Sequence, residues 1–377
     1  MPSLQHPSII RSQTCILYYR ILFPLLLMLA LLNACGNQGV ASVSSVPTDA
    51  AESASATAAP VAPASPTTTT TVQPAPLALA EPSLLEPAMM PQLPTTVTGL
   101  DGETVTIESV ERLISLNGDI TEIIFALDMG DYLVGVDISA SYPPEGVQDL
   151  PRIGYQRQLN AEGLLSLDPT LVIGDEAAGP PEVLSQVRSA GVPVALVADP
   201  PTLESPLQKV RFVAQALGVP QRGEALIAQI EQDLTTAYTL RDQATGPAPR
   251  VLFLYLRGTS MQAVAGSNTP ADTMITAAGG INVGAEVGIE EFEALSPETV
   301  IAAQPDILLV LEKGLESVGG EEGLLNIPGL AETPAGNNRR IVAMDDLYLL
   351  GLGPRTGQAL ADLITVFHAE GVQAGQP

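Results

Sequence analysis

A pattern that occurs twice along the chain is the strongest constraint on its fold. In both copies a helix start with a glutamate in its first turn is followed, seven residues later, by a proline and then by an apolar run. The first copy has Glu162, Pro169 and LVIG, and the second has Glu298, Pro305 and DILLV. Proline ends a helix, and a short apolar run after it is typical of a buried strand. The chain is therefore predicted to contain two similar α/β lobes.

A second spacing repeats in the same order. The segments LDMGDYLVGV and AAGGINVGAE each carry a glycine that is followed, four residues later, by Val-Gly. Strand and helix patterns alternate through 96–219 and again through 247–377, which predicts a mostly parallel sheet in each lobe. Between them, 220–246 forms one long helical pattern. We therefore expect an α/β fold of two Rossmann-like lobes joined by a single long interlobe helix.

Residues 1–35 are predicted to be a secretory signal. Two arginines precede the apolar run ILFPLLLMLALL, which is too short for a comfortable membrane span. The run ends in Leu-Asn-Ala-Cys, which resembles a bacterial lipoprotein box, so we expect Cys35 to be lipidated. An ordinary cleaved signal and an uncleaved anchor are the alternatives. Residues 36–95 are rich in Ala, Ser, Thr and Pro and are predicted to be a disordered tether.

The composition argues against several functions. With 16 Lys and Arg against 42 Asp and Glu, the formal net charge is -26, so nucleic acid is not expected as a partner. The sequence has no HExxH motif, no Cys/His cluster and no GxxxxGK[ST] phosphate loop. One of its two histidines, His6, lies in the signal, and the other, His368, is expected at the surface of the last helix. We find no catalytic constellation and predict that the chain is not an enzyme.

A short loop in the first lobe carries the most distinctive side chains. Tyr155 and Arg157 are two residues apart, so in an extended loop both side chains leave the same side of the backbone. Asn160 can cap the helix that follows, and Glu162 lies in its first turn, where an acid suits the positive end of the helix dipole. Glu298 has the equivalent place in the second lobe.

The order of lobe, long helix and lobe resembles the substrate-binding proteins of iron-complex and cobalamin ABC importers. Several segments most resemble the haem-binding members of that family: RLISLNGDITEIIFALDMGDYLVGVD, LPRIGYQRQLNAEG, LVIGDEAAGPP, SVGGEEGLLNIPGLAETPAG and LGPR. The similarity covers roughly 110–370, nearly the whole folded part. It implies a class III periplasmic binding protein fold, with a ligand held in the cleft between the lobes.

The resemblance also implies roles for single residues. In the haem-binding members the tyrosine of a Gly-Tyr-x-Arg/Lys loop is an axial ligand of ferric haem and the basic residue supports it, which implies these roles for Tyr155 and Arg157. Paired glutamates of the wider family dock on basic residues of the permease, which implies docking for Glu162 and Glu298. The plainer alternatives are a tyrosine packed on the lobe rim, an exposed or acid-paired arginine, and glutamates that only stabilise helix starts.

Tyrosine ligation also makes chemical sense. A phenol has an ordinary pKa of about 10, but ferric iron and a nearby guanidinium favour the phenolate, which is a known haem ligand. Some haem-binding members add a histidine from the second lobe, where this chain has Tyr255, Arg257 and Met261. We therefore expect five-coordinate haem, or a sixth ligand other than histidine. Arg257 and Lys313 are candidates for propionate contacts, and Tyr142 is a candidate for lining the cleft or for packing.

Together these features predict a monomeric receptor in the cell envelope, lipid-anchored on the outer face of the cytoplasmic membrane or in the periplasm. It would capture ferric haem b as cargo, with no catalytic cofactor, and deliver it to an ABC permease dimer with a cytoplasmic ATPase. The nearest alternative is the same fold with a ferric siderophore or cobalamin as ligand. The other is a surface lipoprotein that uses the cleft for sensing or adhesion without a transporter.

Overall fold

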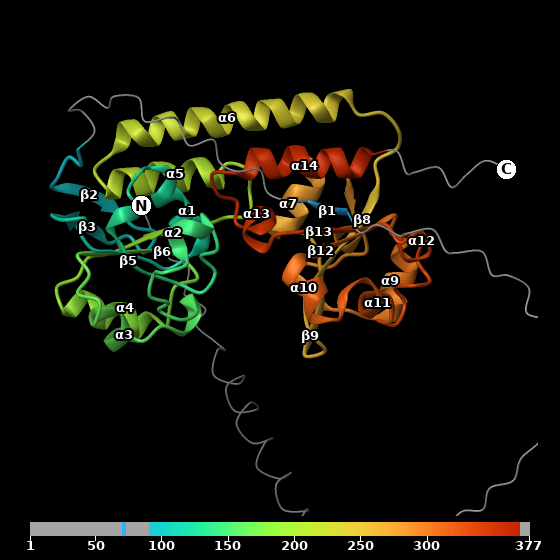
Figure 1. Cartoon of the computed structure of the whole chain (residues 1–377), viewed down its shortest axis with the longest axis horizontal. Coiled ribbons are helices and arrows are strands. Elements are labelled where there is room, and N and C mark those ends of the chain that lie inside the picture. The colour runs from blue at the N-terminus through green and yellow to red at the C-terminus, as the bar shows by residue number, and fades with distance from the viewer. Residues whose placement is uncertain (1–69, 73–89, 370–377) are drawn as a thin grey trace, which may run out of the picture. The chain divides into compact units, whose positions relative to one another are not determined.

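Two α/β lobes make up the structure, a computed structural model that describes residues 70–72 and 90–369 (Figure 1). The predicted signal, Cys35 and most of the predicted tether lie outside these residues. The expectation of two α/β lobes joined by one long helix is confirmed. The connecting helix is α6, Pro220–Gln243, which follows α5 (Ser205–Ala216) of the first lobe and precedes β8 (Arg250–Arg257) of the second.

The first lobe is built on a parallel sheet with strand order β5-β4-β6-β7. Its strands are short, apolar and largely buried, as expected where a parallel sheet is covered by other elements. The chain turns at Asp101 and Gly102 between the antiparallel strands β2 and β3. The elements are β2 (Thr95–Thr98), β3 (Thr104–Ile107), β4 (Leu113–Ser115), α1 (Gly118–Ala126), η2 (Gly130–Tyr132), β5 (Leu133–Val136), α2 (Pro144–Val147), η3 (Gln156–Gln158), α3 (Ala161–Leu165), β6 (Leu171–Asp175), α4 (Pro181–Ser189), β7 (Val194–Val197) and α5 (Ser205–Ala216).

The second lobe contains a mixed sheet with strand order β1-β13-β12-β8-β9-β11, in which β1 is Thr70–Val72, and β10 also pairs with β8. The central strands β13, β12 and β8 are parallel, as predicted, whereas β9 and β11 add an antiparallel edge that the sequence pattern did not indicate. The elements are β8 (Arg250–Arg257), β9 (Met261–Ala265), α7 (Pro270–Ala277), β10 (Ile281–Asn282), α8 (Val283–Glu286), β11 (Phe292–Ala294), α9 (Pro297–Ala303), β12 (Ile307–Leu311), α10 (Glu312–Ser317), α11 (Gly320–Leu325), α12 (Pro334–Asn337), β13 (Ile341–Met344), α13 (Asp346–Leu350) and α14 (Thr356–His368).

The two sequence repeats differ in how far they reflect repeated structure. In the first, α3 and α9 each begin at a side-chain cap and lead through a proline into the buried strands β6 and β12. In the second, the Val-Gly pair of LDMGDYLVGV lies in strand β5, but the pair in AAGGINVGAE begins helix α8. The helix starts there because the Asn282 side chain accepts a hydrogen bond from Gly284 N–H over 3.1 Å and caps it.

The range predicted to be a tether is ordered at two places. Thr70–Val72 forms strand β1, which pairs in parallel with β13, so the expected disorder does not hold for these residues. Gln92 N–H donates to the Gly218 carbonyl oxygen over 2.8 Å, so chain that packs on the first lobe begins before residue 96.

Helix α6 packs against α5 of the first lobe and α14 of the second (Figure 1). It approaches α5 closely at Gly223, where a Cβ atom would lie 2.4 Å from that of Ala214. His368, expected at the surface, is half-buried at the end of α14, with an enclosed Nε2. None of the helices in the described ranges is both long enough and apolar enough to cross a membrane.

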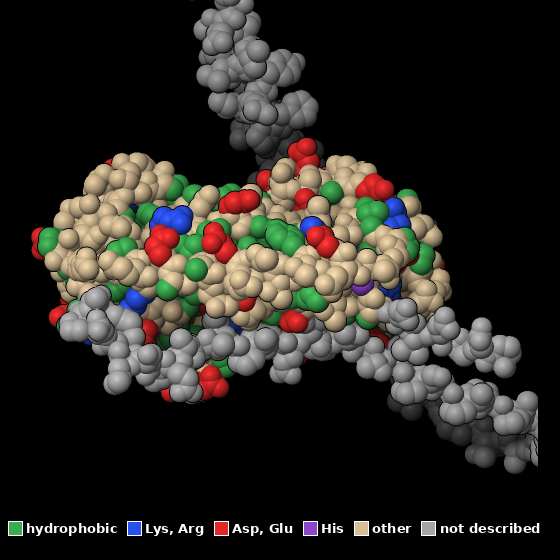
Figure 2. Space-filling model, turned by 90° about the horizontal axis from the view of Figure 1, so that it is seen from above, with side chains coloured by type: hydrophobic (Ala, Val, Ile, Leu, Met, Phe, Trp, Pro, Cys, Tyr) green, Lys and Arg blue, Asp and Glu red, His purple; other side chains and the backbone are tan. Residues whose placement is uncertain are grey.

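Figure 2 shows the molecule from above, turned by 90° from Figure 1, and acidic side chains are spread over this face. Basic side chains lie singly on that face, several of them next to an acid. The part of this face formed by described residues therefore offers no continuous basic surface to a phosphate backbone.

Candidate functional site

One loop of the first lobe is fixed beside the end of β5 by backbone hydrogen bonds. Ile153 N–H donates to the Val136 carbonyl oxygen and Ile138 N–H donates to the Gly154 carbonyl oxygen, each over 3.0 Å. Gly154 has a φ of 94°, a left-handed conformation that glycine adopts without steric cost. The chain turns at this glycine and leads directly into Tyr155.

Tyr155 and Arg157 flank a buried residue and are themselves exposed. Tyr155 is 42% exposed, Gln156 only 8%, and Arg157 again is exposed. Within the part of the chain that the structure describes, neither the Tyr155 hydroxyl nor the Arg157 guanidinium makes a hydrogen bond or an ion pair. The loop therefore presents a phenol and a guanidinium that have no protein partner to give up when a ligand binds.

Beneath this loop, polar side chains collect where three parallel strands end at one edge of the sheet. Asn117 follows β4, Asp137 follows β5 and Asp175 ends β6. The Asn117 amide donates to Asp175, and Ser139 Oγ donates to Asp137 Oδ1 over 2.7 Å. Burial raises the pKa of Asp137 to about 6 and that of Asp175 to about 6. Gly118 N–H also donates to Ser139 Oγ over 2.9 Å, so hydrogen bonds connect the loops that follow the three strands.

A buried ion pair joins the two lobes. Arg355, just before α14, donates to Glu122 of α1 through Nε–Oε1 at 2.8 Å and Nη2–Oε2 at 2.9 Å, and both side chains are 2% exposed. The ring centroid of Tyr142 lies 3.6 Å from the Arg355 Cζ, and that of Tyr348 lies 4.9 Å from it. Guanidinium stacking on aromatic rings is favourable, so the structure gives Tyr142 a packing role at this pair.

Lys209 of α5 is a second buried cation at the contact between lobes. Its ammonium group binds the Asp119 carboxylate, lies 2.7 Å from Asp199 Oδ1, and donates to the Gly351 carbonyl oxygen of the second lobe over 2.9 Å. Burial alone would lower the pKa of Lys209, but Asp119 and Asp199 raise it above its ordinary value. The sequence interpretation missed these groups. Its available signal was two acids, Asp119 and Glu122, spaced three apart in an otherwise apolar helix.

The second-lobe candidates Arg257 and Lys313 both act electrostatically on Asp346. Arg257 donates to Asp346 Oδ2 over 2.8 Å, and its Cζ lies 4.4 Å from the Tyr255 ring centroid. Burial raises the pKa of Asp346, and Arg257 and Lys313 both act in the opposite direction. Lys313 is exposed and makes no hydrogen bond or salt bridge with any residue the structure describes. Arg257 is thus engaged with an acid, whereas Lys313 remains available.

Glu162 and Glu298 lie at matching helix starts and are both exposed. Asn160 Oδ1 accepts from Gly163 N–H in α3, and Ser296 Oγ accepts from Thr299 N–H in α9, each over 3.1 Å. The caps therefore use other side chains, and neither glutamate makes a hydrogen bond or ion pair within the described residues.

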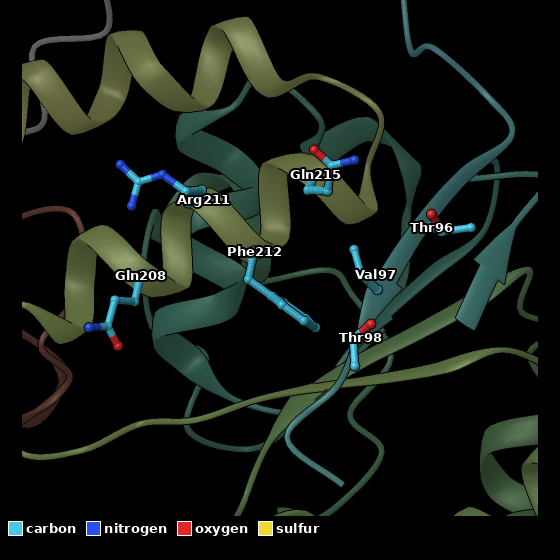
Figure 3. Close-up of a pocket in the computed structure, with 7 residues that line it drawn as sticks. All are labelled: Thr96, Val97, Thr98, Gln208, Arg211, Phe212 and Gln215. Atoms are coloured by element: carbon cyan, nitrogen blue, oxygen red, sulfur yellow. The ribbon is translucent and has the colours of Figure 1, made fainter. Parts of the chain in front are cut away.

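Two surface hollows have linings that do not include the Tyr155 loop. One of about 470 Å³ lies between β2 and α5, where Phe212 points from the helix toward the strand (Figure 3). Another, of about 530 Å³ in the second lobe, is lined by Glu293 and Glu298 among others. Among residues 70–72 and 90–369, no group of three or more His, Cys, Asp and Glu side chains is arranged to hold a metal ion.

The chain belongs to the periplasmic binding protein family, whose model matches residues 113–348, and it has the two-lobed class III fold. The solved structure of the periplasmic heme-binding protein RhuT from Roseiflexus sp. RS-1 is 69% identical, with a TM-score of 0.68, and the match covers 69% of this chain and 99% of that one. The periplasmic heme-binding protein BhuT in complex with two hemes is 38% identical, with a TM-score of 0.64 and coverage of 68% and 98%.

Among curated proteins, a vitamin B12-binding protein of Vibrio parahaemolyticus is 27% identical over 266 residues, which are 71% of this chain and 92% of that protein. The family and these relatives are substrate-binding transport proteins rather than enzymes. Their periplasmic character supports an extracytoplasmic location for this chain.

Proposed function

We propose that this protein binds ferric haem through Tyr155 and passes it to the permease of an ABC importer. The observation that carries the proposal is the exposed pair of Tyr155 and Arg157, which lies on a fixed loop and has no partner among the described residues. Tyrosinate is a known ligand of haem iron, and Lys313 is an available cation for a propionate. The haem-binding relatives at 69% and 38% identity support haem as the ligand class.

Cobalamin is the second candidate, because the vitamin B12-binding relative is 27% identical over most of its length. Ferric siderophores arrive with filled iron coordination and would leave Tyr155 without a role. The higher identity to haem-binding proteins and the exposed phenol both favour haem over these ligands.

Titration of purified residues 36–377 with haemin, followed by absorption spectroscopy, tests the proposal. We expect about one haem per protein and a high-spin, tyrosinate-type spectrum, because the described part of the chain offers no histidine beside Tyr155. A parallel titration with cyanocobalamin is the competing arm. A low-spin spectrum of the bis-histidine type, or tight cyanocobalamin binding without haemin binding, would contradict the proposal.

The proposal includes a monomeric chain anchored to the membrane through lipidated Cys35, on the basis of the Leu-Asn-Ala-Cys motif. Metabolic labelling with a fatty acid should tag the full-length chain, because the cysteine thiol is the group that a lipoprotein box modifies. The Cys35→Ser chain should carry no tag, and continued labelling of this variant would rule out the anchor.

The proposal also gives Glu162 and Glu298 the role of docking on the permease. Two exposed carboxylates, one in each lobe, suit two basic contacts from a two-fold symmetric partner. The double variant Glu162→Ala, Glu298→Ala should bind haemin like the wild type. It should lower transport at least about tenfold in vesicles that contain the permease and its ATPase, because rim charges set encounter and orientation.

Glu182→Ala is the matched control, since Glu182 is also an exposed acid in the first turn of a helix. Loss of a first-turn acid costs only about 0.3–1 kcal/mol, so all three substitutions should leave the lobes folded. Wild-type transport by the double variant would reduce both glutamates to helix stabilisation.

A further inference from the structure

Gln156 is the residue of the Tyr155 loop that is anchored in the lobe. Its side chain is 8% exposed, whereas Tyr155 and Arg157 on either side are exposed. With the amide nitrogen facing inward, Gln156 donates to Asp137 Oδ2 over 3.0 Å and to the Leu116 carbonyl oxygen over 3.3 Å. The loop is therefore connected through one side chain to the ends of β4 and β5.

Asp137, the residue that holds the Gln156 amide, is inaccessible to solvent and is itself hydrogen-bonded. Asp137 is 0% exposed, and its other carboxylate oxygen, Oδ1, already accepts from Ser139 Oγ over 2.7 Å. Among the described residues, the Gln156 amide is the side-chain donor to Oδ2. Backbone N–H groups of Ser139 and Ala140 also stabilise the Asp137 carboxylate, and the Gln156 amide adds a further hydrogen bond to it in a buried site, so the pair should hold its geometry tightly.

The backbone on both sides of Gln156 continues this attachment. The Gln156 carbonyl oxygen accepts from Gly179 N–H over 2.8 Å, and Leu159 N–H donates to the Gly179 carbonyl oxygen over 2.9 Å. Gln158 N–H donates to the Tyr155 carbonyl oxygen over 2.8 Å and closes the short turn η3. These bonds hold the loop at its C-terminal side, while the left-handed Gly154 on its other side is free of side-chain constraint.

We propose that Gln156 is the positioning residue of the ligand site: its buried amide turns Tyr155 and Arg157 outward together and holds their relative placement. The expected effect on ligand binding rests on the proposed function, in which Tyr155 and Arg157 contact the ligand. Gln156 itself touches no ligand. Such an anchor should strengthen ligand binding by Tyr155 and Arg157, because a loop that is already ordered loses less conformational freedom when the ligand binds.

The first test uses the protein without ligand. Gln156→Met keeps the side-chain length and removes the amide, and Gln158→Met, at an exposed position of the same turn, is the control. In amide hydrogen exchange, Gln156→Met should speed exchange at Gln158, Leu159 and Gly179 by about tenfold or more, because opening of the loop breaks their hydrogen bonds. Exchange as slow as in the control would overturn the inference, whatever the ligand is.

The second test measures the consequence for haemin. Gln156→Met should weaken haemin binding by about tenfold, the equivalent of about 1.4 kcal/mol, and should shift the tyrosinate band, whereas Gln158→Met should change neither. In a background that carries both Tyr155→Phe and Arg157→Ala, the effect of Gln156→Met on affinity should vanish, since a positioning residue acts through the groups it positions. An unchanged effect in that background would overturn the inference and reduce Gln156 to a packing role.

The two tests separate this inference from the proposed function. Faster exchange in Gln156→Met together with no haemin binding by the wild type would support the anchor and refute haem as the ligand. A wild type that binds haemin with the tyrosinate spectrum, and a Gln156→Met variant that matches it in exchange and affinity, would refute the anchor alone. If Gln156→Met does not fold, Gln156→Asn takes its place. Its side chain is shorter by one methylene, so its amide can reach Asp137 only by drawing the loop inward. The same two measurements apply, and faster exchange and weaker haemin binding are expected again.

Discussion

Tyr155→Phe is expected to abolish the tyrosinate band of the haemin complex and to weaken haemin binding at least about a hundredfold. The substitution removes one oxygen and keeps the ring, so it separates iron ligation from packing. Tyr155 is 42% exposed and has no partner among the described residues, and loss of its hydroxyl should therefore cost the fold almost nothing. Absorption titrations and urea unfolding measure the two effects independently.

Two further variants help to interpret this result: one removes the neighbouring cation and the other is a control. Arg157→Ala should weaken binding by less, about 1.5–3 kcal/mol, because it removes one charge-assisted contact and leaves the iron ligand in place. Tyr238→Phe in α6, whose ring stacks against Arg241 at 4.9 Å, is the matched control and should bind haemin like the wild type. A Tyr155→Phe variant that keeps the wild-type spectrum would show that another residue is the iron ligand.

The local elements of this fold could be predicted from the sequence because their signals are local. A glutamate after a cap and a proline seven residues later placed α3 and α9, and apolar runs placed β6 and β12. The antiparallel edge of β9 and β11 was missed because β11 is exposed along its whole length and lacks an alternating pattern.

The contacts between the lobes could not be predicted because their partners are far apart in the sequence. Glu122 and Arg355 are 233 residues apart, and Lys209 meets the Gly351 carbonyl oxygen, a backbone atom with no sequence signal. Tyr142 was a candidate for lining the cleft or for packing; its ring packs on Arg355, a partner too distant in the sequence to be predicted. Gln156 was overlooked between two conspicuous side chains, although the short Tyr-Gln-Arg spacing leaves one residue to face inward.

Arg355→Met is expected to lower the free energy of unfolding by about 3–5 kcal/mol, because it leaves the carboxylate of Glu122 buried without its partner. Both side chains are 2% exposed, so water cannot replace the lost hydrogen bonds. Burial already raises the pKa of Glu122, and Arg355 opposes that shift. Without Arg355 the folded-state pKa should rise further above the unfolded value, so the destabilisation should be greater at neutral pH than at acidic pH, where Glu122 takes up a proton.

Urea unfolding of three variants tests this account of the lobe contact. The double variant Glu122→Met, Arg355→Met should recover most of the stability lost in Arg355→Met, because no buried charge remains. Arg211→Met is the exposed control: its ion pair with Glu224, at 3.2 Å, has side chains 57% and 63% exposed, and its loss should cost less than about 1 kcal/mol. If Arg355→Met costs no more than Arg211→Met, the buried pair does not hold the lobes together, and the packing of α6 against α14 must do so instead.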